Sequence, residues 1–411
     1  MGNGQSAMVL GLLLPIVHCP LPAQDTTASG VRIGITYAPG TRPALAVVQY
    51  TEPGLDSIGV ILARDLDHSD RFEMVPAQDA AGFVVSLAAD GPGRVTVSLQ
   101  DARTGQVSLR RPIPTGAGLR AATHAVADEI VRVAFGQPGI ASSALLFVRN
   151  GRIWRVDADG HGARELRTAG SPALSPAWAP DGRSFAYTAY VRSGQPIVVQ
   201  DLASGARRVL DGTEYGLNIT PAFSPDGRRI AFARGLESGT DVYVSSVAGG
   251  EPQRLTSGRG DNLSPVWSPD GSRIAFISTR PGSPQLYVMN ADGTGQEVLA
   301  RFDFGATGTT SAPAWSPDGQ LIAFHREVGG VPQVFVLDPS RGSLRQITGS
   351  GRNEDPSWAP DGRHLVFAST RAGGRDLQVV DLETGRTRQL THLRGARLPA
   401  WSPRLASGVD R

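Results

Sequence analysis

Short apolar runs separated by polar turns make up most of the chain between residues 141 and 405. Ile274–Ile277 and Leu286–Met289 are two such runs, and the polar turn Asn290–Gly293 follows the second of them. Apolar runs of this length, bounded by Gly, Pro, Asn and Asp, are typical of β-strands joined by tight turns. The pattern predicts small antiparallel sheets of four strands each, repeated along the chain.

One motif, Pro-x-aromatic-Ser/Ala-Pro-Asp-Gly, occurs five times, and a truncated copy spans Pro399–Pro403. The aromatic residues of these copies are 43 to 48 residues apart: Trp178, Phe223, Trp267, Trp315, Trp358 and Trp401. A period in the forties with short strands predicts the blades of a β-propeller, so six copies predict six blades. Pro-Asp-Gly supplies a turn in each blade, and the aromatic residue is expected to fill the gap between neighbouring blades.

The two ends of the propeller complement each other. The strand-like segments Ala144–Val148 and Ile153–Val156 come before the first full copy of the motif and have no copy of their own. The truncated copy at the other end has no blade of its own. Together they predict one blade in which a C-terminal strand closes the ring and removes the free sheet edges.

The residues before the propeller combine helical and strand patterns. Two segments carry apolar residues at helical spacing, namely 56–66 and 119–135. Five segments are strand-like, namely 44–49, 71–75, 82–88, 94–100 and 107–111. We therefore expect a mainly β protein, with an arm and a small α/β domain over residues 24–137 and a six-bladed β-propeller over residues 141–405.

Residues 1–23 are similar to a secretory signal peptide. Met8–Val17 is apolar, and Leu21–Ala23 has the small residues of a cleavage site, which predicts export with cleavage near Ala23. The sole cysteine, Cys19, lies in this segment, so the mature protein is expected to lack a thiol. No other stretch reaches the roughly 20 apolar residues of a membrane span, so none is expected.

Charge and composition exclude several functions. The net charge is +2 without a long run of either sign, so a nucleic-acid partner is not expected. All 40 basic residues are arginine, which excludes a P-loop lysine and a Schiff-base lysine. The sequence contains no Gly-x-Ser-x-Gly motif, and its histidines have no metal-ligand spacing. We therefore expect no enzyme activity, no metal and no cofactor.

The repeated aspartates have two interpretations, as acid/base or ion-binding groups or as turn residues. Their recurrence at the same place in every blade favours the turn interpretation: Asp181, Asp226, Asp270, Asp318 and Asp361. Asp157–Gly160 and Asn290–Gly293 are faintly similar to calcium loops but lack the closing glutamate.

The chain resembles the TolB family, the periplasmic component of the Tol-Pal system. The resemblance rests on the repeats together with Val31–Ile33, Arg42-Pro43 and Leu398–Pro403. It implies a monomer in the periplasm whose propeller binds Pal, a peptidoglycan-associated lipoprotein. It also implies that the N-terminal arm communicates with TolA, an inner-membrane protein. Such a protein supports outer-membrane integrity and constriction during cell division.

The loops before each Pro-x-aromatic segment are expected at one end of the central channel. They vary while the strands repeat, which suits a binding surface with a polar rim. We expect partner-binding residues among them: Asn218, Thr220, Asn262, Ser264, Asn353, Glu354 and Asp355. The family's Pal-contacting histidine corresponds to Leu217 here, so the contacts are expected to differ.

The arm carries alternating apolar residues after a polar segment. Val31, Ile33 and Ile35 alternate with Arg32 and Gly34, so this segment can dock as a strand on its own protein or on a TolA-like partner. Since the two dockings exclude each other, we expect a two-state switch. Two alternatives remain open for the whole chain: an exported propeller that binds a carbohydrate or small ligand, and a peptidase-associated propeller without its catalytic domain.

Overall fold

The computed structural model describes residues 1, 41–48, 55–76, 78–258, 260–299 and 310–405. The expected signal peptide and the switch arm with Val31, Arg32, Ile33 and Ile35 lie outside the described residues. Residues 36–411 group into one compact unit, which holds the small domain and the propeller. Among the helices that are described, none is both long and apolar enough to cross a membrane.

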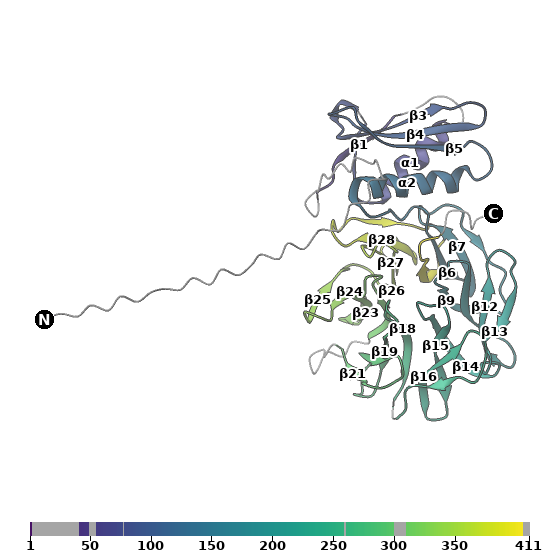
Figure 1. Cartoon of the computed structure of the whole chain (residues 1–411). Helices are drawn as coiled ribbons and strands as arrows, with labels where there is room; N and C mark the ends of the chain where they lie inside the picture. Colours follow the sequence, from purple (N-terminus) through teal and green to yellow (C-terminus); the bar gives the residue numbers. More distant parts are fainter. Residues whose placement is uncertain (2–40, 49–54, 77, 259, 300–309, 406–411) are drawn as a thin grey trace. The chain divides into compact units, whose positions relative to one another are not determined.

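A small α/β domain precedes the propeller, as predicted (Figure 1). Its sheet has the order β2-β1-β3-β4-β5, with β1 parallel to both neighbours and the rest antiparallel. The strands are β1 (Ala44–Val47), β2 (Glu73–Met74), β3 (Phe83–Ala89), β4 (Arg94–Asp101) and β5 (Val107–Pro114). The helices are α1 (Leu55–His68), α2 (Leu119–Phe135) and the short 3₁₀ helix η1 (Gln78–Ala80). Ile58 and Leu62 of α1 and Ile130 of α2 pack on Val85 and Val97 of the sheet to form the core.

Six antiparallel sheets follow as the blades of a propeller. In the first three blades the strands are β30 (Ala396–Trp401), β6 (Ala144–Arg149), β7 (Arg152–Asp157), β8 (Arg164–Glu165); β9 (Ala173–Trp178), β10 (Ser184–Ala189), β12 (Ile197–Asp201), β13 (Arg207–Val209); and β14 (Gly216–Phe223), β15 (Arg229–Leu236), β16 (Gly239–Ser246), β17 (Gln253–Arg254), with β11 (Gly194–Gln195) added beside β14. In the last three they are β18 (Asn262–Trp267), β19 (Arg273–Ser278), β20 (Gln285–Asn290), β21 (Glu297–Val298); β22 (Thr310–Trp315), β23 (Ile322–Val328), β24 (Val331–Asp338), β25 (Ser343–Gln346); and β26 (Asn353–Trp358), β27 (His364–Ser369), β28 (Asp376–Asp381), β29 (Thr387–Gln389).

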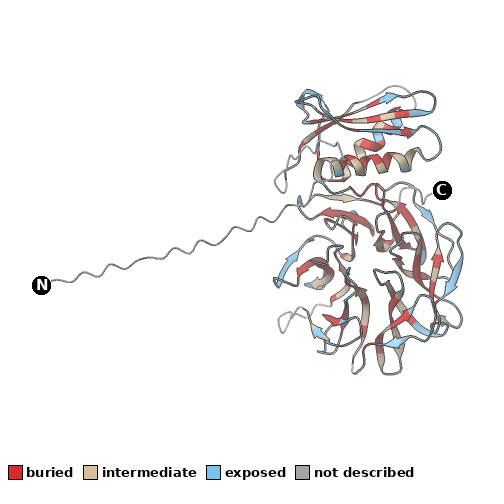
Figure 2. Cartoon of the chain, viewed as in Figure 1, coloured by how far each residue is buried: buried red, intermediate tan, exposed pale blue. Residues whose placement is uncertain are grey.

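The C-terminal strand closes the ring. β30 pairs antiparallel with β6, with Trp401 opposite Leu145 and Ala400 opposite Leu146. The first strands β9, β14, β18, β22, β26 and β30 each neighbour the first strands of the two adjacent blades, so they surround the channel axis. Figure 2 shows buried residues along the inner strands of the blades, whereas the outer strands such as β13 and β25 are exposed.

The repeated aromatic residues lie between blades. Trp267 is 5% exposed, and its Nε1 donates to the carbonyl oxygen of Ala222 in the preceding blade at 3.2 Å. Trp178 and Trp358 make the equivalent bonds to Ala400 and Ala314. Trp401 is also buried and donates instead to the hydroxyl of Ser143. Phe223 and Trp315 are half-buried, and Trp315 donates to the carbonyl of Gly319 in its own turn.

The Pro-Asp-Gly segments form turns. The amide of Ser272 donates to Asp270 Oδ1 at 3.0 Å, and the hydroxyl of Ser268 donates to the same oxygen. These two bonds lower the pKa of Asp270 to about 2, and the bond from Ser268 has the larger effect. The aspartate therefore stays ionised and stabilises its turn.

Each first strand contains a β-bulge immediately before its proline. The residue before the proline has a left-handed backbone, with φ between 50° and 55°, in all six blades: Ser175, Thr220, Ser264, Ala312, Asp355 and Leu398. Because proline has no N–H to donate to the neighbouring strand, pairing is interrupted there and an extra residue is accommodated. The pairing register shifts at this position in every blade.

Candidate functional site

The candidate site is the end of the channel where the inter-blade loops gather. In the five blades with a complete motif, the Pro-Asp-Gly turn joins the first and second strands, so the loops leading into the next blade lie at the opposite end. We call this end the channel mouth; its described loops are 166–172, 210–215, 255–258, 347–352 and 390–395. The small domain contacts the other end, where Asp70 faces His364 beside the turn of the last Pro-Asp-Gly copy. The channel mouth thus lies on the end away from the small domain.

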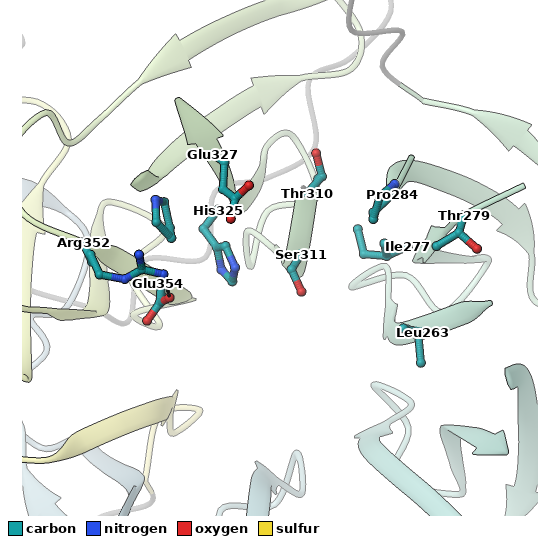
Figure 3. Close-up of a pocket in the computed structure, with 11 residues that line it drawn as sticks. Leu263, Ile277, Thr279, Pro284, Thr310, Ser311, His325, Glu327, Arg352 and Glu354 are labelled. Atoms are coloured by element: carbon teal, nitrogen blue, oxygen red, sulfur yellow. Dashed lines mark hydrogen bonds and ion pairs between the residues drawn. The ribbon is translucent and has the colours of Figure 1, made fainter. Parts of the chain in front are cut away.

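A pocket of about 270 Å³ opens at the channel mouth between the blades of β18, β22 and β26. Figure 3 shows its two sides. Glu327, His325, Arg352 and Glu354 form a polar side, and Leu263, Ile277, Thr279 and Pro284 form the facing side. An opening of mixed polar and apolar character suits a side chain of a protein partner or a small polar ligand.

Charge in the pocket is largely paired. Glu354 lies 3.2 Å from Arg352 and 2.9 Å from Arg375. Burial lowers the pKa of His325, against the effect of Asp355, so the imidazole is neutral at neutral pH. Burial also raises the pKa of Asp355, and the nearby His325 partly offsets this rise. The pocket therefore presents a neutral histidine beside ion-paired side chains.

Ser311, His325 and Asp355 have the residue types of a hydrolase triad. Their geometry is different from that of a triad, because the backbone amide of Asp355 donates to His325 Nδ1 at 3.1 Å. A triad histidine must instead donate from Nδ1 to the carboxylate. The carboxylate oxygen of Asp355 lies 3.9 Å from this nitrogen. The arrangement orients His325 and does not prepare Ser311 for nucleophilic attack.

Three predicted partner-binding residues are buried in strands, contrary to the expectation of exposed loop residues. Asn218, Asn262 and Asn353 are 0%, 0% and 1% exposed and belong to β14, β18 and β26. The Nδ2 of Asn353 donates to Gln333 Oε1 at 2.9 Å and to the carbonyl of Ser350 at 3.0 Å. Replacement by alanine would leave such groups unsatisfied, so it cannot serve as a neutral test of partner binding.

These asparagines belong to a repeated polar network that sequence reasoning missed. In the blade before Asn353, Thr348 donates to Gln333 Oε1 at 2.7 Å. Asp241 lies in the blade before Asn262. Its Oδ1 accepts hydrogen bonds from the hydroxyl of Thr256 at 2.6 Å and from Asn262 Nδ2 at 2.9 Å. The detectable signal is the recurring apolar-Thr pair after the outer strand, at Leu255-Thr256, Ile347-Thr348 and Leu390-Thr391. In the blades of Asn218, Asn262 and Asn353, these bonds tie the preceding inter-blade loop to the first strand of the blade.

The other four predicted residues lie near the channel mouth. Thr220, Ser264 and Asp355 are the left-handed bulge residues of their strands and are half-buried. Glu354 is half-buried and ion-paired. Sequence reasoning missed Tyr215, which is 77% exposed at the mouth and close to Leu217, itself 36% exposed. Tyrosine is enriched among the residues that contribute most to protein interfaces, so an exposed tyrosine at the mouth is a candidate partner contact.

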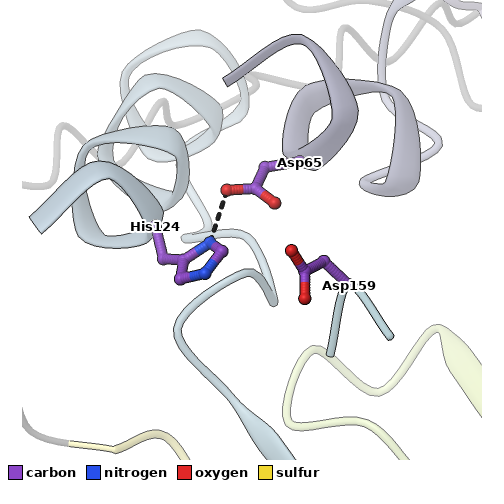
Figure 4. Close-up of side chains that lie close together, drawn as sticks. All are labelled: Asp65, His124 and Asp159. Carbon is purple, nitrogen blue, oxygen red and sulfur yellow. Dashed lines mark hydrogen bonds and ion pairs between the residues drawn. The ribbon is translucent and has the colours of Figure 1, made fainter. Parts of the chain in front are cut away.

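Away from the mouth, two groups of buried Asp and His have the residue types of a metal site: Asp65, His124 and Asp159 (Figure 4), and Asp70, His364 and Asp381. In the first group, His124 Nδ1 lies 2.6 Å from Asp65 Oδ2. Asp159 forms ion pairs with Arg64 at 2.6 Å and with Arg120. Asp381 is paired with Arg363. Because arginines already supply positive charge at these carboxylates, the groups are better described as ion-pair networks than as cation sites.

Comparison with known proteins relates the chain to the TolB family. The family model described as TolB beta propeller domain matches residues 136–405. The Tol-Pal system protein TolB of Nitrosococcus oceani is 32% identical over 237 residues, which is 49% of this chain and 54% of that protein. The protein of the same name from Albidiferax ferrireducens is 35% identical over 231 residues, covering 49% and 53% of the two chains. The chain thus spans about half the length of the curated relatives it matches.

A solved structure extends the similarity to most of the chain. The crystal structure of TolB from Acinetobacter baumannii superposes with a TM-score of 0.78 at 27% identity. The alignment covers 89% of this chain and 98% of the other. It therefore includes the small domain as well as the propeller.

Proposed function

This chain belongs to the TolB beta-propeller family, and from that premise we propose that it acts as the TolB component of a Tol-Pal system in the periplasm. The observation that carries the proposal is the family match across the whole propeller, residues 136–405. The chain would act by binding envelope proteins without chemistry, which supports outer-membrane integrity and constriction during division. The orientation of His325 in the pocket fits a binding surface better than an active site.

We place the binding of a Pal-like, peptidoglycan-associated lipoprotein at the channel mouth. Tyr215 and Leu217 would provide the apolar contact, while Thr220, Ser264 and Glu354 would lie at the polar rim. Asn218, Asn262 and Asn353 would act indirectly, because they hold the loops in place. The mouth is available for this role since the small domain occupies the other end of the propeller.

Replacing both Tyr215 and Leu217 with alanine should weaken the binding of a Pal-like lipoprotein by at least about tenfold, or about 1.4 kcal/mol. The physical reason is that a few residues, often tyrosines, contribute most of the binding energy of many interfaces, and removing Leu217 as well takes away the adjoining apolar surface. Isothermal titration calorimetry measures the effect. The matched control is Leu344→Ala on β25, which is 40% exposed but lies on an outer strand. If the double variant and the control bind the lipoprotein with equal affinity, the interface does not lie at the channel mouth.

We propose that the arm binds a TolA-like inner-membrane protein through Val31, Arg32, Ile33 and Ile35. Its alternating apolar residues support strand-like docking. A mature protein without residues 24–36 should lose this binding, and its affinity for the lipoprotein should shift by about five-fold or more through coupling between the sites. Pull-down with the TolA-like protein and calorimetry with the lipoprotein measure the two effects. If neither changes, the arm has no switching role.

The pocket in Figure 3 keeps one alternative open, an exported propeller that binds a carbohydrate or small polar ligand. Thr279, Ser311 and Glu327 would then contact ligand hydroxyls. Thermal-shift measurements with envelope glycans distinguish this function from lipoprotein binding, because only a ligand held by the folded state raises the unfolding temperature.

A further inference from the structure

A buried histidine joins the small domain to the propeller. His364, the first residue of β27, is 0% exposed. Its Nδ1 lies 2.7 Å from Asp361 Oδ2 in the adjacent propeller turn. Its Nε2 lies 3.2 Å from Asp70 Oδ2, which follows α1 of the small domain. One imidazole ring therefore bridges two carboxylates from different domains.

This geometry fixes the protonation state of the ring. A carboxylate faces each nitrogen, and only the imidazolium can donate from both nitrogens at once. Burial favours the neutral ring, but Asp361 and then Asp70 outweigh it and raise the pKa of His364 to about 9. The doubly protonated ring is thus the form present at neutral pH.

Charged groups surround His364 from each of the elements that pack near it. They are Asp67, Asp70 and Arg71 at the end of α1, Asp361 and Arg363 beside the turn, Asp381, Glu383 and Arg386 around the β28–β29 connection, and Arg388 of β29. Arg386 reaches Asp67 at 2.6 Å and Asp70 at 3.0 Å. Asp361 and Asp381 have lowered pKa values, because the favourable pairing with His364 and Arg363 exceeds the cost of burial. These two carboxylates remain ionised throughout the range in which His364 loses its proton.

The contact between the domains depends on charge more than on apolar packing. The buried residues in the apolar core of the small domain come from the small domain itself, with one exception. The exception is Ala141, which follows α2. A polar interface of this kind permits domain movement more readily than a large hydrophobic one. The connection is held separately, because Asp128 accepts hydrogen bonds from the amides of Ala141 at 2.7 Å and Ser142 at 2.9 Å. If the small domain left its contact, these bonds would keep it tethered at the connection.

We propose that His364 is a proton-dependent latch that holds the small domain on the propeller. The docked state needs two ring protons, one for Asp361 and one for Asp70. The undocked state needs only the proton shared with Asp361. Docking thus binds an additional proton, and by linkage it weakens as the pH rises. Because Asp70 adds to the effect of Asp361, the pKa of His364 is higher in the docked state than in the undocked state, and the stabilisation of docking is lost as the pH rises through about 9.

Energy transfer between two dyes tests the latch in the full chain. The dyes are attached at Val60→Cys on α1 and Leu344→Cys on β25, both exposed, in a Cys19→Ser background. We expect one docked population at about pH 7 and a second population above about pH 9. In the His364→Gln variant the ratio of docked to undocked molecules should fall at least about tenfold at neutral pH, and the pH response should disappear.

His392→Gln is the matched control, since His392 is an exposed histidine of the same propeller, in the loop between β29 and β30. Asp70→Asn removes the small-domain carboxylate without changing the propeller, and it should reproduce the effect even if His364→Gln fails to fold. Circular dichroism confirms that each variant is folded. Unchanged energy transfer in the Asp70→Asn variant, or a pH response that persists in folded His364→Gln protein, would overturn the proposal.

Discussion

Replacement of Trp267 by alanine should lower the free energy of unfolding by about 3 to 5 kcal/mol. Trp267 is buried against Val242 and Leu255 of the preceding blade and Phe276 of its own blade. The Arg229 guanidinium lies over its ring at 4.4 Å, and its Nε1 donates to Ala222. The substitution removes all of these contacts and leaves a cavity between two blades. Chemical denaturation measures the loss.

Trp315→Ala is the matched control for this prediction. Trp315 occupies the same place in the next repeat, but it is half-buried and its Nε1 bonds within its own turn. We expect a clearly smaller loss of stability there. If both variants unfold at the same denaturant concentration as the unmodified protein, the tryptophans do not stabilise the blade interfaces.

Deletion of residues 398–411 should prevent the propeller from closing. The deleted part of β30 pairs with β6. The deleted residues also exchange hydrogen bonds with the second blade and with the residues at the start of β6. Trp178 Nε1 donates to Ala400 at 3.0 Å, Trp401 Nε1 to Ser143 at 2.8 Å, and the amide of Ala144 to Ser402 at 3.0 Å. The loss should approach the whole stability of a typical protein, about 5 to 15 kcal/mol, because the first blade loses its inner strand.

Gel filtration and thermal unfolding measure this effect. The deletion exposes the edge of β6, so we expect aggregation and no cooperative transition. A chain that ends at Leu405 keeps all of β30 and should unfold as the full chain does. A monomeric 398–411 deletion with an unchanged unfolding midpoint would contradict closure by β30.

The repeats allowed most of the fold to be predicted, because their signals are local. The spacing of Trp267 and Trp315 predicted the number of blades, and the orphan copy around Trp401 predicted the pairing of β30 with β6. The helical spacing of Ile58 and Leu62 predicted α1 and its buried face. These signals depend on residues within about one repeat of each other.

The site was less predictable, because its properties depend on distant residues. Asn353 reads as a polar loop residue, but Gln333 and Thr348 of the preceding blade bury it. His364 reads as one of several scattered histidines, and Asp70, its small-domain partner, is 294 residues away. Burial and charge pairing of this kind arise only when blades and domains pack together. The sequence alone carries no periodic signal for them.

Titration of the mature protein with the soluble domain of the peptidoglycan-associated lipoprotein from the same organism is the most direct test of the proposed Tol-Pal role. Isothermal calorimetry should show saturable binding of one lipoprotein per chain, and the two proteins should co-elute in gel filtration. The Tyr215→Ala/Leu217→Ala variant should show at least about tenfold weaker binding. Absence of both a heat of binding and co-elution, with folded protein on each side, would contradict the proposed function.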